Sequence, residues 1–321
     1  MTQPSETYDR YDQIGVREQL IDKITNASPE DTPVIAALGR ATSTNTLYEY
    51  QRDSLATPNA NNAAIDGDDA AGDAITPTQR LGNYHQIFRG VTIISGRADA
   101  VKTAGRSKES SYQIAKKYKE IQRDGEAAIL SKNPAVLGNS TTAMKMAGFG
   151  VHLYTNALHN GAGATAAHTS GAPTTAVTAG TNRTFTGTLL ETAMQNCYTN
   201  SGKTPPMVVV SPSHKVIFSQ FSGIAANRVD VGKRSEGMVV YGADVYQSNF
   251  GRLTVVPHYM MASKNYVLGI NPEYADVVYL RGFQSKPLAR TGDAEKTMQL
   301  VDMSLAVRNE KCMFKIDDLT P

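Results

Sequence analysis

The chain has 321 residues, of which 40% are hydrophobic and 19% are charged, so it can bury a large core and global disorder is not expected. Lys and Arg number 32 against 30 Asp and Glu, which argues against a sequence-specific nucleic-acid binder, because such proteins carry a stronger basic excess. The two cysteines, Cys197 and Cys312, argue against a disulfide framework or a cysteine-rich zinc site. The polar N-terminus and the short aliphatic run at 207–210 predict a soluble chain made in the cytosol, with no contact with a membrane.

Residues 1–41 predict an arm with two short helical segments. Residues 17–25 carry a narrow apolar stripe, and Ser28-Pro29 resembles a capped helix start that Pro33 interrupts before the apolar run 34–38. The arm has too few apolar residues to fold alone, so we expect it to contact the body or another subunit. These candidate assembly contacts are Ile14, Leu20, Ile21, Ile24, Val34 and Ile35.

Residues 42–97 predict a long hairpin whose strands are 46–51 and 86–95. The intervening stretch, 57–77, has almost no large apolar residue and is too long for a loop inside a compact domain. It therefore predicts a projecting tip. Four acids gather on it: Asp66, Asp68, Asp69 and Asp73. They lack the EF-hand spacing, so a solvated or partner-docked tip is favoured over a calcium site.

Residues 107–131 predict the longest helix, because Ile114, Tyr118, Ile121 and Gly125 recur at helical spacing. Its lysines fit a solvated face better than a nucleic-acid surface, although both interpretations stay open. Residues 188–200 and 213–221 predict further helices. Strands are predicted at 207–210, 238–247, 252–258 and 265–269, and in one or two pieces over 297–314, and 271–281 is ambiguous, with a short helix from Pro272 as one interpretation. Without a βαβα rhythm, this mixture predicts the α+β class.

No catalytic, cofactor or metal site is predicted. Gly161-x-Gly163 imitates a dinucleotide fingerprint but lacks the flanking strand and helix. Ser211 to His214 is better explained as a strand end that turns into a capped helix than as part of a catalytic triad. The six histidines form no HxH or HxxxH pair. The sequence therefore does not favour an enzyme.

Several stretches resemble the major capsid proteins of a group of tailed bacteriophages. They are Tyr11-Asp12-x-Ile14-Gly15-x-Arg17-Glu18-x-Leu20 and the run from Ile24 to Gly39, then 208–215, and near the carboxyl end 291–296 and 307–311. The stretches occur in family order over nearly the whole chain. The resemblance implies the Hong Kong-phage capsid fold, an α+β fold with an arm, an extended loop, a peripheral domain and an axial domain.

On this resemblance the arm is 1–41 and the extended loop is 42–97. The peripheral domain is 98–204 together with 276–321 and contains the spine helix 107–131, and the axial domain is 205–275. A basic loop at 223–236, with Arg228, Lys233 and Arg234, would reach the capsomer axis. Basic residues of a neighbouring subunit, such as Arg281, Lys286 or Arg290, would contact the acidic residues of the tip.

The implied function is a major capsid protein that self-assembles, as hexamers and pentamers, into the icosahedral head shell of a tailed dsDNA phage. Implied partners are other copies, a portal, a scaffold or cement protein, and packaged dsDNA through non-specific contact; no cofactor is implied. The expected location is the virion, after assembly in the host cytoplasm. Two alternatives stay open: an encapsulin-like cellular shell protein and a phage tail or adhesin component.

Overall fold

The computed structural model of the chain describes residues 26–67, 72, 74–221 and 245–321. The first half contains α1 (Pro33–Ala37), β1 (Gly39–Thr42), β2 (Leu47–Arg52), β3 (Gln79–Tyr84), β4 (Gln86–Ser95), α2 (Gly96–Ala100), α3 (Glu109–Ile129), α4 (Phe149–His152) and β5 (Ala157–Leu158). The second half contains α5 (Gly187–Ser201), β6 (Met207–Val210), α6 (Pro212–Ser219), β7 (Val245–Ser248), β8 (Gly251–Pro257), η2 (Tyr259–Met261), β9 (Val267–Ile270), η3 (Pro272–Tyr274), β10 (Ala275–Pro287), β11 (Ala294–Val307), η4 (Glu310–Cys312) and β12 (Phe314–Ile316). The predicted α+β class is confirmed.

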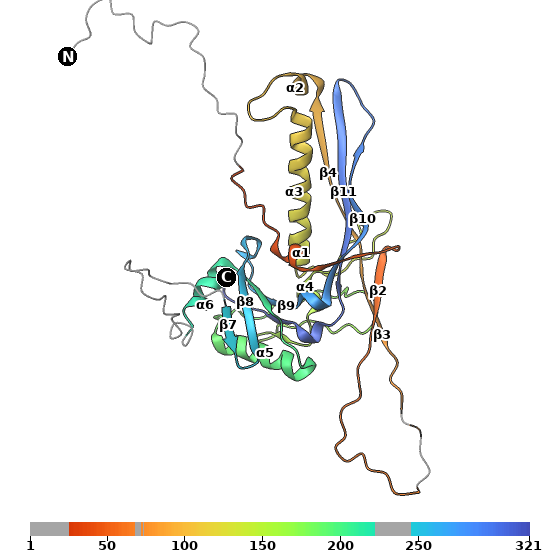
Figure 1. Cartoon of the computed structure of the whole chain (residues 1–321), viewed down its shortest axis with the longest axis vertical. Helices are drawn as coiled ribbons and strands as arrows, with labels where there is room; N and C mark the ends of the chain where they lie inside the picture. The colour runs from red at the N-terminus through yellow and green to blue at the C-terminus, as the bar shows by residue number, and fades with distance from the viewer. Residues whose placement is uncertain (1–25, 68–71, 73, 222–244) are drawn as a thin grey trace, which may run out of the picture.

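A four-stranded sheet and the long helix α3 form the upper layer of the molecule (Figure 1). The strand order is β1-β10-β11-β4, with β1 parallel to β10 and the other pairs antiparallel. The helix packs along β4 and β11, and Gly125 permits the close approach, since a Cβ there would lie 2.4 Å from Cε of Met303. The predicted spine helix 107–131 agrees with α3 to within two residues at each end.

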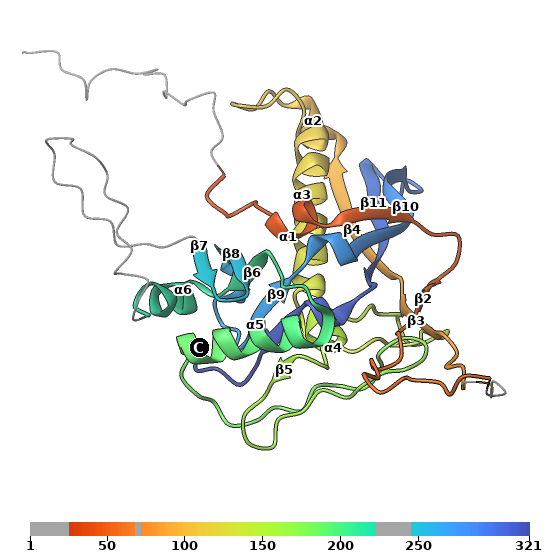
Figure 2. The same ribbon diagram turned by 60° about the horizontal axis from the view of Figure 1, so that its bottom comes forward.

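A six-stranded sheet forms the lower part, in the order β5-β12-β9-β6-β8-β7 (Figures 1 and 2). Its core adds residues of α5, such as Leu190 and Met194, and of the chain end, such as Phe314 and Leu319. The predicted range 205–275 therefore does not hold this whole unit, because β5, α5 and β12 belong to it. The sequence did not reveal that β5 and β12 belong to this sheet, because strands of two and three residues are too short to show an alternating pattern.

The hairpin prediction is wrong in its pairing. Strand β2 pairs with β3, not with the stretch 86–95, and the register runs from Leu47 opposite Tyr84 to Arg52 opposite Gln79. Strand β4 instead pairs with β11 along its whole length. The projecting segment thus begins after Arg52 and returns at Gln79, and β4 is free to complete the main sheet.

The arm enters the core at α1. No helix forms at Ser28, which is a second correction, and Thr32 gives α1 no side-chain cap. The Glu126 carboxylate of α3 provides the acceptors instead, taking the N–H of Val34 and of Ile35, both at 2.8 Å. The arm then follows α3 upward, where Gln122 donates to the Thr32 hydroxyl at 2.8 Å.

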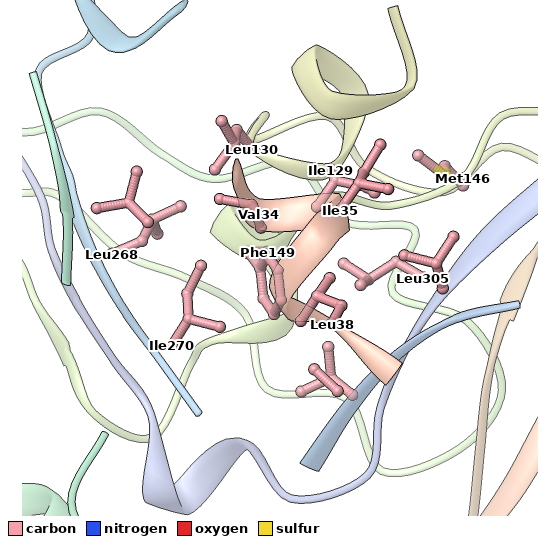
Figure 3. Close-up of a cluster of buried hydrophobic side chains, with 14 of the residues drawn as sticks. Val34, Ile35, Leu38, Ile129, Leu130, Met146, Phe149, Leu268, Ile270 and Leu305 are labelled. Carbon is pink, nitrogen blue, oxygen red and sulfur yellow. The ribbon is translucent and has the colours of Figure 1, made fainter. Parts of the chain in front are cut away.

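Val34 and Ile35 were predicted as contacts with another subunit, but the structure packs both side chains inside their own chain, so the body takes this contact. Their side chains are 0% and 3% exposed and lie among Ile129, Leu130 and Phe149 (Figure 3). Helix α1 is only one turn long, so its sequence pattern could not show that side chains of α3 and α4 cover it. These two residues therefore have almost no surface to offer to a neighbour.

Replacing Glu126 by Ala should lower the free energy of unfolding by about 3 kcal/mol or more, because it strands two buried backbone N–H groups. Urea denaturation measures this change. Glu120→Ala is the matched control on the same helix; its carboxylate is part-exposed and pairs with Lys117, so the loss should stay below about 1 kcal/mol. Equal losses in the two variants would contradict the role assigned to Glu126.

Candidate assembly surfaces

The segment between β2 and β3 leaves the body as a long projection (Figure 1). Leu55, Ile65 and Ile75 on it are 99%, 78% and 92% exposed. Asp66 is also exposed, whereas Asp68, Asp69 and Asp73 lie outside the described residues. These three large apolar side chains have no cover from the described part of the chain, so they are available for a contact with another molecule. We call residues 53–78 the hairpin tip.

The root of the hairpin is firmly attached to the body. The Arg52 guanidinium donates to the Tyr154 hydroxyl at 2.7 Å and to the Gln79 amide oxygen at 2.8 Å. Strand β3 also exchanges backbone bonds with Gly171: the N–H of Gly82 donates to its carbonyl at 2.8 Å, and its own N–H donates to the Arg80 carbonyl at 2.9 Å. The loop 159–186 therefore fixes the direction in which the hairpin leaves.

Two histidines pack beneath this root. The rings of His152 and His168 lie 5.6 Å apart, and Tyr154 covers His168 at 5.1 Å. Neither ring nitrogen of His152 has a hydrogen-bond partner in the described part of the chain. Burial, and then the neighbouring His168, lowers the pKa of His152 to about 3. Burial, and then the Arg52 charge, lowers the pKa of His168 to about 4.

The four-stranded sheet has one open face. Ile87, Val91 and Ile93 of β4 are 56%, 45% and 59% exposed, and their alternation places them on the side away from α3. Strand β4 alternates so clearly that the sequence alone could have revealed this stripe. We call these three residues the apolar stripe.

The three basic residues predicted to meet a neighbour's acidic tip differ in whether they already form an ion pair within their own chain. The Arg281 guanidinium already pairs with Asp302 of its own chain at 3.1 Å, and Arg290 lies 3.7 Å from Glu295. Lys286 is exposed opposite Met298 in the sheet. Of the three, Lys286 is the one without an ion pair in the described part of the chain.

The other candidate contacts cannot be placed. Ile14, Leu20, Ile21 and Ile24 of the arm lie outside the described residues, as do Arg228, Lys233 and Arg234 of the basic loop. These assignments stay predictions.

The residues considered above as possible catalytic groups are part of the folded framework wherever the structure describes them. Ser211 caps α6, accepting the His214 N–H at 3.0 Å, and both residues are fully buried. Cys197 and Cys312 are buried and unpaired. Over the described residues, no group of three His, Cys, Asp or Glu is placed to hold a metal. In the same part of the chain, no helix has the length and apolar character needed to cross a membrane.

This arrangement, a helix-backed sheet with a second sheet below and a projecting hairpin, is shared with shell-forming proteins. The cyanophage A-1(L) capsid chain matches it with a TM-score of 0.65 and 12% identity, over 95% of this chain and 98% of that one. The capsid of cyanophage P-SCSP1u matches with a TM-score of 0.58 and 11% identity, over 98% and 99%. The holo-SrpI encapsulin complex of Synechococcus elongatus PCC 7942 matches with a TM-score of 0.55 and 11% identity, over 95% and 92%. The implied Hong Kong-phage capsid fold is confirmed, and the fold alone is common to phage capsids and encapsulin.

Sequence comparison narrows the class. The family model described as SU10 major capsid protein matches residues 3–320, so the chain belongs to that family. The major capsid protein of Escherichia phage Phieco32 is 37% identical over 121 residues. This match covers 38% of the present chain and spans about a third, 34%, of that protein's length.

Acid should destabilise the folded chain through His152. An unfolded histidine has a pKa of about 6.5, well above the lowered pKa of the buried ring, so the unfolded state binds more protons once the pH falls below this value. The free energy of unfolding should therefore fall as the pH drops from 7 towards 4. His152→Phe keeps a buried ring and removes the titration, so the loss between about pH 6.5 and 5 should shrink by about 2 kcal/mol. Urea denaturation at both pH values tests this, and parallel curves for variant and wild type would refute it.

Proposed function

We propose that the chain is the major capsid protein of a tailed dsDNA bacteriophage, which self-assembles as hexamers and pentamers into an icosahedral head shell around the genome. Family membership and the fold support this proposal. The observation that carries it is the hairpin tip, whose exposed Leu55, Ile65 and Ile75 are not covered by the described part of their own chain. No catalytic role is proposed.

The contacts between copies would come from segments that leave the body. The arm upstream of Pro33 starts from a fixed point at Glu126, and its residues Ile14, Leu20, Ile21 and Ile24 would extend to a neighbour. The hairpin tip would lie on another copy, with Lys286 as a basic contact for its acids. The domain names, arm, extended loop, peripheral domain and axial domain, are part of the same proposal.

Other partners and the location follow from the same function. A portal and a scaffold or cement protein would join the shell, packaged dsDNA would touch it without sequence specificity, and the shell would be built in the host cytoplasm and end in the virion. The similarity to encapsulin supports a cellular compartment as the alternative. Purified particles that contain protein cargo instead of DNA would favour that alternative.

Electron microscopy of the overexpressed full chain tests the proposal directly, and large hollow particles are the expected result. The triple variant Leu55→Ser, Ile65→Ser, Ile75→Ser should fold with unchanged stability yet raise the protein concentration needed for shells about 100-fold or more. The reason is that each buried apolar side chain contributes about 1.5–3 kcal/mol to a contact.

The matched control replaces exposed apolar residues of the body, Leu137, Tyr198 and Val216, which are 63%, 52% and 51% exposed, by Ser. It should still assemble. Normal shells from the hairpin variant would sink the role of the tip, and the absence of particles from the wild-type chain would sink the proposed function itself.

The shell should be held together without covalent links. Residues 24–101, which include the hairpin tip, contain no lysine, so the hairpin offers no amine for an isopeptide bond. Both cysteines are buried, which removes them from disulfide exchange between subunits. Mature particles boiled in detergent and reductant should therefore run as one band near 34.6 kDa. A ladder of larger bands would show that this expectation is wrong.

A further inference from the structure

The positive charge of the chain is concentrated in one segment. Residues 97–123 contain eight Lys and Arg against three Asp and Glu, a net charge of +5, whereas the whole chain carries only +2. The rest of the chain is therefore net negative. This segment comprises α2, the loop that follows it and most of α3.

Part of this charge is neutralised inside the chain. Arg106 pairs with Glu109, Lys117 pairs with Glu120, and Lys119 pairs with Glu30 of the arm. Four bases are exposed and form no salt bridge within the described residues: Arg97, Lys102, Lys108 and Lys116. We call these four residues the basic stripe.

On α3 itself, Lys116 of the basic stripe shares one side of the helix with two further basic residues. Lys116, Lys119 and Arg123 lie at spacings of three and four residues, so they share a helix face, and Lys108 is the residue that directly precedes the helix. The apolar side chains of α3 point away from this face, towards the sheet, where Ile121 is buried at 2% exposure. The helix thus presents charge on one side and packs with the other.

The surface lacks what a protein interface needs. Interfaces between proteins have an apolar centre and few charged residues in it. None of the large hydrophobic residues of α3, which is described in full, is exposed, whereas the apolar stripe lies on the opposite side of the same layer. The two sides of this layer therefore suit different partners: the apolar stripe suits protein, and the basic stripe suits a polyanion.

We propose that the basic stripe contacts the phosphate backbone of double-stranded DNA, so that the α3 side of the layer forms the inner wall of the shell. This inference rests on the proposed function for the presence of DNA inside a shell, although DNA binding can be measured without one. Lysine is a point charge that contacts phosphates without reading bases. Four contacts predict that the logarithm of the affinity falls with the logarithm of salt with a slope of about −3 to −4.

The first experiment measures binding of short random duplex DNA to the full chain, kept below the concentration at which shells form, at about 50 to 200 mM salt. Lys102→Glu, Lys108→Glu, Lys116→Glu should weaken binding about tenfold or more at low salt and make the slope shallower by about 2 to 3. The control Lys145→Glu, Arg252→Glu, Lys264→Glu makes the same change of charge at exposed positions off the stripe and should change binding far less. If the first triple variant unfolds, the Lys→Gln triple at the same positions replaces it.

The second experiment adds the same DNA to closed wild-type shells. Shells should not bind it, because the basic stripe faces inward. Binding to closed shells, or equal loss of affinity in both triple variants, would overturn the proposal. A stripe variant that binds DNA normally but no longer assembles would also overturn it, since the stripe would then contact the acidic hairpin tip of a second copy. DNA binding through the stripe by a chain that never forms shells would support the DNA contact and refute the proposed function.

Discussion

The Glu126 carboxylate decides how the N-terminal segment is joined to the body. It accepts the N–H of Val34 and Ile35, and His258 donates to it through Nε2 at 3.1 Å, because the other ring nitrogen, Nδ1, accepts the Met260 N–H. A fully buried carboxylate is tolerated only when its oxygens are hydrogen-bonded. The start of α1, the end of α3 and the segment after β8 must therefore meet in one arrangement. The arm consequently departs from a fixed position on α3, which is what a segment that reaches a neighbour in a defined direction requires.

The body of the molecule contains the buried cores, whereas the projecting hairpin tip is exposed. The subunit has two cores of its own, one around α1 and α3 and one around α5 and the six-stranded sheet. The described residues of the hairpin tip are absent from both cores, and Leu55 among them is almost completely exposed. Contacts made by such a tip can each be weak, since many linked contacts act together in a closed assembly. A firm root and an exposed tip together allow folding to precede assembly.

Prediction from the sequence succeeds for elements whose apolar residues recur at regular spacing. It fails for elements that bury polar residues. Helix α3 was predicted because its apolar residues recur at helical spacing, and β6 because it is a pure aliphatic run. Strand β3 was missed because it contains Gly82 and Asn83; Asn83 is fully buried, and its amide donates to the carbonyls of Ala147 and Leu305 at 3.0 and 2.8 Å. Glu126 was equally hidden, since its partner Val34 is 92 residues away. Tertiary partners at such separations leave no local pattern, and the exposed hairpin side chains could be inferred only from the absence of a core around them.

The end of the chain supports the hairpin through buried charges. Lys315 is fully buried, donates to the Gly150 carbonyl and the Thr165 hydroxyl, both at 2.7 Å, and lies 3.3 Å from Asp317; burial lowers its pKa to about 8. Asp318 accepts the N–H of Gly180 at 2.8 Å. These contacts hold both ends of the loop 159–186, whose middle, at His168 and Gly171, carries the hairpin root. The loop contains no helix or strand, yet it is held in place because Lys315 of β12 and Asp318, which follows that strand, bind its polar groups. The direction in which the hairpin leaves the body thus depends on residues far along the chain from the tip: Lys315 lies 240 positions after Ile75.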